Sequence, residues 1–94
     1  HPNTKNTLNR LLPIRLSTKA ERIRRREVKR AMTKLGDLTE SQVREIEHMS
    51  HMIVRKLLRE PMIKLNSFAG TQQEDYYVNA VTKLFKIDVL KERE

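Results

Sequence analysis

The sequence predicts an all-α domain, a small bundle of three main helices with short connecting segments. Two helix-start signals support this prediction, because Thr18-Lys19-Ala20-Glu21 and Thr39-Glu40-Ser41-Gln42 both have the spacing of a capping box. Each is followed by a stop signal, Leu35-Gly36 for the first helix and Pro61 for the second. The 94 residues include only two Gly and three Pro, too few for the many tight turns of a sheet-rich fold.

The first thirteen residues are polar and basic. Leu8, Leu11 and Leu12 are spaced like one side of a short helix, but Pro13 is expected to interrupt any regular run. We therefore interpret residues 1–13 as a leader or the tail of a preceding element, and residues 14–94 as the helical domain.

The first clear helix is predicted from about Lys19 to Leu35, with one broad apolar face and an opposite basic face. Arg24 projects into the middle of the apolar face, and Glu27 lies at its edge. Because residues i and i+3 can meet on a helix surface, we interpret these two as an ion pair at the margin of an interface. The apolar face comprises Ala20, Ile23, Val28, Ala31, Met32 and Leu35, and the basic face comprises Lys19, Arg22, Arg26, Lys29 and Arg30.

The second helix is predicted from about Glu40 to Arg59, where apolar residues recur at spacings typical of the seam of a bundle. Ser50 is the one polar member of this seam and would let two helices approach closely. The seam consists of Val43, Ile46, Ser50, Ile53 and Leu57, flanked by Met49, Val54 and Leu58.

Beyond Pro61, a short apolar segment from Met62 to Leu65 precedes a loop between Asn66 and Gln73. A last helix is predicted from about Glu74 to Lys86. One side of it carries Tyr77, Ala80, Val81, Leu84 and Ile87.

The apolar stripes predict self-association. The stripe of the second helix is longer and wider than one short helical partner covers, and leaving it exposed would create an aggregation-prone patch. A homodimer that packs these stripes together would complete the thin core of so short a chain. The residues predicted to form the dimer interface are Ile23, Val28, Leu35, Val43, Ile46, Met49, Ile53 and Leu57.

Cysteine is absent, which excludes a disulfide framework, a zinc finger and a thiol nucleophile, and fits a cytoplasmic setting. No apolar run reaches the roughly 18 residues of a membrane span. Glu45 and His48 have the spacing of a di-iron ligand pair, but His48 and His51 project onto a polar face beside Arg44 and Arg55, which would repel a cation. We therefore expect no metal site, no catalytic residue and no cofactor site in this segment.

Positive charge is concentrated in the first part of the chain. Residues 1–38 hold 11 Lys and Arg against 3 Asp and Glu, whereas residues 39–94 hold 9 of each. The basic face of the first helix is either a solvated surface or a stripe that meets phosphates, with structured RNA favoured over sequence-read DNA. The alternative to a dimerisation module is therefore a stand-alone basic helical protein that binds nucleic acid.

Several runs of this sequence resemble the C-terminal dimerisation domain of glutamyl-tRNA reductase. They are KAERIRRREVKRA at residues 19–31, KLGDLT at residues 34–39 and MSHMIVRKLLREP at residues 49–61, and the resemblance covers roughly residues 13–65. The chain departs from the family pattern at Ser17, Arg55 and Arg59.

The resemblance implies a V-shaped homodimer, in which a long spinal helix joins each arm's catalytic and NADPH-binding domains to this segment. Such an enzyme reduces glutamyl-tRNA to glutamate-1-semialdehyde through a cysteine thioester, the first step of the five-carbon route to tetrapyrroles such as porphyrins. Neither the cysteine nor the NADPH site maps onto this segment, which is expected to hold the protomers together. Residues 1–12 would be either the end of the spinal helix or its junction with the dimerisation bundle. Arg24 and Glu27 would form a structural contact, and the candidate tRNA contacts would be Lys19, Arg22, Arg26, Lys29 and Arg30.

Overall fold

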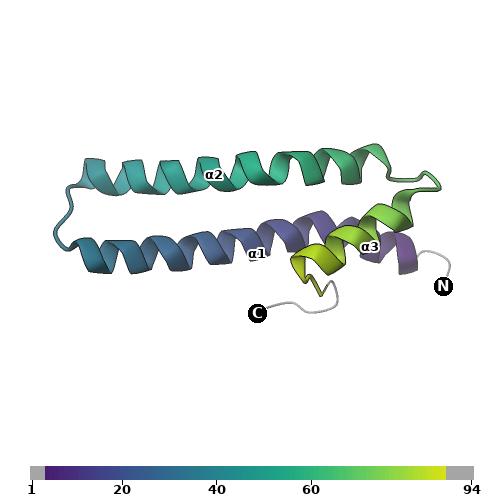
Figure 1. The fold of residues 1–94 in the computed structure, drawn as a ribbon, viewed down its shortest axis with the longest axis horizontal. Helices are drawn as coiled ribbons and strands as arrows, with labels where there is room; N and C mark the ends of the chain where they lie inside the picture. The colour runs from purple at the N-terminus through teal and green to yellow at the C-terminus, as the bar shows by residue number, and fades with distance from the viewer. Residues whose placement is uncertain (1–3, 89–94) are drawn as a thin grey trace.

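The computed structural model describes residues 4–88, which form three helices: α1 (Thr4–Leu35), α2 (Glu40–Ser67) and α3 (Glu74–Phe85). α1 and α2 form a long antiparallel hairpin, and α3 lies against the N-terminal half of α1 (Figure 1). The molecule is elongated, with extents of 54 × 24 × 19 Å. Within the described range, none of the helices combines the length and hydrophobicity that a membrane crossing requires. The all-α prediction is confirmed.

The hairpin turn forms at the residues that the sequence predicts. Gly36 has a positive φ of 81°, and its N–H donates to the Met32 carbonyl at 3.1 Å, which ends α1. Thr39 then opens α2 with a complete capping box. Its Oγ1 accepts from the Gln42 N–H at 3.1 Å, and its own N–H donates to Gln42 Oε1 at 2.9 Å. These local hydrogen bonds explain why both helix boundaries can be read from the sequence.

The start of α1 differs from the prediction. The helix does not begin at Thr18 but runs from Thr4 through Pro13 without a break. A proline inside a helix removes a backbone hydrogen bond and costs about 3 kcal/mol. Leu12 and Leu16 on either side of it are almost fully buried, at 0% and 2% exposure. Full burial of a leucine side chain contributes about 1.5–3 kcal/mol, so tertiary packing offsets the cost of the proline.

α2 also continues through a proline that the sequence analysis treats as a stop. Instead of ending before Pro61, the helix extends to Ser67. Leu58, Met62 and Leu65 lie on both sides of the proline, and all three belong to the packed core. The short apolar segment predicted after Pro61, together with the first residues of the predicted loop, is therefore the last part of α2.

α3 confirms the last predicted helix to within one residue at its end. Glu74 and Asp75 place negative charge in its first turn, which favours the positive end of the helix dipole. Lys86 ends the helix in the left-handed conformation, with φ 55° and ψ 57°. The N–H of Ile87 then donates to the Thr82 carbonyl at 2.9 Å, which closes the last turn.

The core lies where all three helices meet, in residues 8–19 and 58–88, which we call the three-helix end. Phe68, at the C-terminus of α2, stacks on Tyr77 of α3 with ring centroids 4.4 Å apart. This stacking ties the turn between the two helices to the core. The buried cluster consists of Leu12, Leu16, Leu65, Val81 and Ile87, with Leu58, Met62, Tyr77 and Val78 packed against it.

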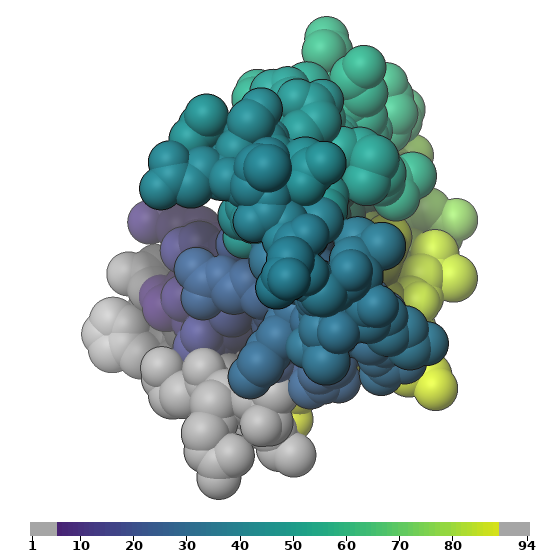
Figure 2. Space-filling view, turned by 90° about the vertical axis from the view of Figure 1, so that its left-hand side faces the viewer, coloured from purple at the N-terminus to yellow at the C-terminus, as the bar shows by residue number. Residues whose placement is uncertain are grey.

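The rest of the hairpin, residues 20–57, is only two helices thick, and we call it the arm. Seen from the tip of the hairpin, α2 stacks on α1, and α3 is set off to one side (Figure 2). In the arm, which is described throughout, Val28 is the one buried apolar side chain. The arm therefore has almost no core of its own.

Candidate self-association face and polar clamp

One side of α2 carries a row of apolar side chains along the arm. Ile46, Met49, Ile53 and Leu57 follow one another at spacings of three and four residues, so they share one side of the helix. Met49, Ile53 and Leu57 are 54%, 50% and 71% exposed, and Ile46 is half-buried. We call these four residues the apolar stripe. A contiguous exposed apolar surface of this kind is typical of a protein-binding face.

The other predicted interface residues divide between surface and interior. Ile23 and Leu35 on α1 are exposed, and Val43 on α2 is half-buried. Val28 is buried in the single chain, so it packs within the hairpin. Five of the eight residues predicted to form the dimer interface are therefore exposed in the single chain: Ile23, Leu35, Met49, Ile53 and Leu57. The interface itself stays a prediction.

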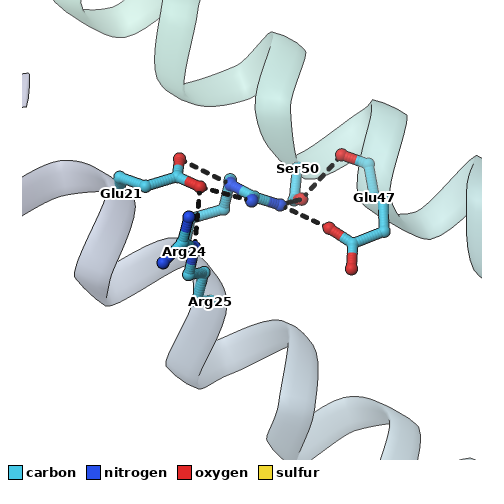
Figure 3. Close-up of polar contacts among 5 residues, drawn as sticks. All are labelled: Glu21, Arg24, Arg25, Glu47 and Ser50. Carbon is cyan, nitrogen blue, oxygen red and sulfur yellow. Dashed lines mark hydrogen bonds and ion pairs between the residues drawn. The ribbon is translucent and has the colours of Figure 1, made fainter.

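A polar cluster joins α1 to α2 in the middle of the arm (Figure 3). Arg24 reaches from α1 toward α2 with its side chain only 10% exposed. It binds Glu21 in a bidentate manner, with Nε donating to Oε1 at 2.9 Å and Nη2 donating to Oε2 at 2.6 Å. Its Nη1 donates across the hairpin to Glu47 Oε1 at 2.7 Å and to Ser50 Oγ at 3.0 Å. We call Glu21, Arg24, Glu47 and Ser50 the polar clamp.

Ser50 completes the clamp on the α2 side. Besides accepting from Arg24, its hydroxyl donates to the backbone carbonyl of Glu47 at 3.0 Å. Arg24 and Ser50, the polar residues that interrupt the predicted apolar faces of α1 and α2, therefore contact each other. A guanidinium that is largely shielded from solvent and has several oxygen partners in one geometry fixes the position of α1 along α2.

The clamp changes the acid–base properties of its members. The hydrogen bonds from Arg24 lower the pKa of Glu21 from 4.5 to about 2, with a smaller contribution from Arg25, whose Nε donates to Glu21 Oε2 at 3.1 Å. The hydrogen bonds to Glu21 and then to Glu47 raise the pKa of Arg24. Both groups are therefore charged at neutral pH, as charge-assisted hydrogen bonds require.

Two sequence predictions about these residues are corrected. Arg24 pairs with Glu21 and Glu47, whereas the expected partner Glu27 lies exposed on α1. Glu21 was expected to complete a capping box with Thr18, but both residues are inside a continuous helix whose backbone needs no cap at that point. The carboxylate of Glu21 binds Arg24 and Arg25 instead.

The structure separates the five basic residues predicted as tRNA contacts. Lys19 lies at the C-terminal end of α3, where its Nζ donates to the carbonyls of Phe85 at 2.6 Å and Lys86 at 3.1 Å. A cation at this end of a helix binds its last carbonyls and favours the helix dipole. Arg22 is half-buried. The basic residues that stay exposed along the arm are Arg26, Lys29 and Arg30.

Sequence reasoning missed the contacts of Lys19 and Ser50. The last carbonyls of any helix lack partners within the helix, but nothing local indicates which of the many lysines supplies the donor. For Ser50 a signal was present, because it and Arg24 each interrupt an apolar stripe. Pairing the two polar exceptions would have led to the clamp.

Residues 4–88 can also be compared with the patterns of a metal site and of a dinucleotide-binding loop. Between residues 4 and 88 there is no group of three or more His, Asp or Glu that could hold a metal ion, and His48 and His51 are exposed. A dinucleotide loop needs clustered glycines between a strand and a helix. Gly36 and Gly70 instead lie in two separate turns that connect helices.

An elongated helical hairpin with an exposed apolar row is typical of the helical association modules. The sequence narrows this class to one family. Residues 14–87 match the family described as "Glutamyl-tRNAGlu reductase, dimerisation domain", and the chain belongs to this family.

Relatives of the chain carry the corresponding name. It is 34% identical over 80 residues to a glutamyl-tRNA reductase of Carboxydothermus hydrogenoformans, covering 85% of this chain and 18% of that protein. It is 36% identical over 76 residues to one of Desulforudis audaxviator, covering 80% and 17%, and 40% identical over 72 residues to one of Myxococcus xanthus, covering 76% and 16%. The chain thus spans less than a fifth of the length of these relatives. No solved structure gives a significant match.

Proposed function

We propose that this segment holds two copies of a glutamyl-tRNA reductase together through the apolar stripe. The observation that carries the proposal is the exposure of Met49, Ile53 and Leu57 in a member of a dimerisation-domain family. In a two-fold symmetric contact the same patch is used by both partners, so one apolar row can cover its own copy. The polar clamp would hold the arm in the shape that presents this row.

The size of the apolar surface supports a contact wider than the stripe alone. Burying a half-exposed Ile, Leu or Met contributes about 1 kcal/mol, so Met49, Ile53 and Leu57 of two copies would contribute about 6 kcal/mol. Association itself costs about 4–15 kcal/mol. We therefore include Ile23 and Leu35, which are also exposed on the arm, in the proposed interface.

The proposal implies a longer protein, in which the catalytic residues lie outside this segment. The names of the relatives support an enzyme that acts on glutamyl-tRNA. We propose that it is an NADPH-dependent oxidoreductase that forms glutamate-1-semialdehyde, and that the present segment contributes association.

Sedimentation equilibrium of the 94-residue chain at low and high salt tests the proposal. We expect a dimer of about twice the 11.2 kDa chain mass that persists at high salt, because apolar contacts are not screened. Ile53→Asp should raise the dimer dissociation constant about 100-fold, because two carboxylates would be buried without partners. Tyr76→Asp, on the exposed side of α3, is the matched control and should leave the dimer intact. A monomeric native chain, or a dimer insensitive to Ile53→Asp, would contradict the proposal.

A second function, contact with the tRNA substrate, is supported by the exposure of Arg26, Lys29 and Arg30 along one face of the arm. Phosphate contacts by such residues are sequence-independent and salt-sensitive. We expect the triple variant Arg26→Glu, Lys29→Glu, Arg30→Glu to weaken tRNA binding in fluorescence anisotropy. Equal tRNA binding by the native chain and the triple variant would exclude this face.

A further inference from the structure

A groove runs along the hairpin where the arm joins the three-helix end. Ser17 and Glu21 of α1 form one wall, and the stretch of α2 between His51 and Ile63 forms the other. Its volume is about 580 Å³. The α2 wall spans thirteen residues, and its two ends lie about 18 Å apart at a rise of 1.5 Å per residue, which is the length of about three turns of a partner helix.

The floor of the groove is apolar and adaptable. Val54, Leu58 and Met62 line it and are half-buried, and Met52 and Ile63 extend it outward. Methionine side chains are flexible and polarizable, and they suit surfaces that adjust to an incoming apolar side chain. A floor of this kind fits the i, i+3, i+4, i+7 side chains of an amphipathic helix.

The rim of the groove is positively charged. Arg55, Lys56 and Arg59 all line the groove and are exposed. Among residues 4–88, Glu21 is the one acidic residue of the lining, and its carboxylate already accepts hydrogen bonds from Arg24 and Arg25. An incoming ligand therefore meets three cations over an apolar floor.

Most of the groove lies away from the proposed dimer face, and of its three rim cations only Lys56 projects next to Met49 at the border of the apolar stripe. His51, Arg55, Leu58 and Met62 follow one another at spacings of four, three and four along one side of α2. At 100° per residue, this side is opposite to the apolar stripe of Ile46, Met49, Ile53 and Leu57. Both sides of α2 can therefore be occupied at the same time.

We propose that this groove binds an acidic amphipathic helix of another protein. Charge complementarity selects this occupant, because carboxylates flanking an apolar row would meet Arg55, Lys56 and Arg59 while the row enters the floor. A second copy of this chain, with a net charge of +8, would bring further positive charge to the rim. RNA would use the rim but leave the half-buried Leu58 and Met62 without contacts.

The test uses the 94-residue chain and a fluorescein-labelled synthetic helix of about 18 residues, built from Leu at helical spacing and Glu elsewhere. We expect saturable binding in fluorescence anisotropy, with NMR shift changes at Leu58 and Met62. Arg55→Glu with Arg59→Glu should weaken binding about tenfold or more. The matched control Arg26→Glu with Arg30→Glu makes the same charge change on the arm of α1 and should leave binding unchanged.

Several results would overturn the proposal. Equal weakening by both double variants would indicate unspecific charge attraction, and equal binding of the same peptide with Lys in place of Glu would remove the charge argument. Shift changes at Met49 and Ile53 in place of the groove would show that the peptide imitates a second copy. A short RNA could also displace the peptide. If this displacement requires Arg55 and Arg59, the rim of the groove binds nucleic acid and not an acidic helix. Sedimentation of the same variants keeps this test independent of dimerisation, because the groove variants should leave the dimer mass unchanged.

Discussion

The three-helix end and the arm are built from the same kinds of residue, but they bury them differently. Leu12 is completely buried where α3 covers α1, whereas Leu57 on the arm is 71% exposed. The difference is the third helix, because two helices in contact leave the outer half of each surface uncovered. The three-helix end completes its core within one chain, and the arm would need a second chain to do so.

The two regions also hold their helices together by different means. Side-chain packing does so at the three-helix end, and the polar clamp around Arg24 does so in the arm. Apolar packing is non-directional, whereas a guanidinium with fixed oxygen partners specifies one arrangement. The arm, which has little core, therefore obtains its defined helix arrangement from the directional contacts of Arg24.

The largest difference between the two regions is expected when a leucine of each is replaced by alanine and the free energy of unfolding is measured. Leu12→Ala should lower the free energy of unfolding by about 2–5 kcal/mol, because it leaves a cavity in the core. Leu57→Ala should change it by less than about 0.5 kcal/mol in the monomer, because the side chain is already largely in water. Urea unfolding at low protein concentration, followed by far-UV circular dichroism, measures both. Similar losses for the two variants would mean that the arm is as well packed as the core.

The second effect concerns the clamp. Arg24→Met should destabilise the chain by about 1–3 kcal/mol, because two carboxylates and a hydroxyl lose a charged donor. Glu47→Gln should cost less, since Glu47 is half exposed. In the Arg24→Met background, Glu47→Gln should have almost no further effect, and a double-mutant cycle measures this coupling. Additive effects would argue that Arg24 and Glu47 do not act together.

The clamp also predicts a dependence on pH. The pKa of Glu21 is lowered from 4.5 to about 2, so its stabilisation is present above about pH 4.5 and is lost as the pH falls toward 2. Melting temperatures measured across this window should fall more steeply for the native chain than for Glu21→Gln. Parallel curves for the two proteins would contradict the pairing of Glu21 with Arg24.

The smallest expected effect lies at the contact of α3 with α1. Lys19→Ala removes the cation from the last carbonyls of α3 and should cost about 0.3–1 kcal/mol. Amide hydrogen exchange should show faster exchange in α3 and little change in the arm. Lys29→Ala, which changes an exposed lysine of the same helix, serves as the control. Unchanged exchange in α3 would show that packing alone holds it.

Local signals in the sequence suffice to predict the hairpin turn, the start of α2, the extent of α3 and the positions of the apolar stripes. Gly36 and the Thr39–Gln42 capping box act through backbone hydrogen bonds within a few residues, so their effect can be read locally. The stripes follow from the helical repeat alone. The five basic residues predicted as tRNA contacts stay a prediction, and the sequence did not show that Lys19 and Arg22 would differ from Arg26, Lys29 and Arg30 in exposure.

Three features depend on how the helices pack: whether the prolines break the helices, which partners Arg24 binds, and which carbonyls Lys19 contacts. Pro13 and Pro61 are helix breakers by local rules, yet both helices continue because leucines on each side of each proline pack in the core. Leu12, Leu16 and Leu65 are buried, and Leu58 is half-buried. Arg24 had a nearby candidate in Glu27, but Glu47 and Ser50 became available only when α2 folded back beside α1. Local signals act through neighbouring backbone groups, whereas burial and ion pairing depend on residues that only folding brings together.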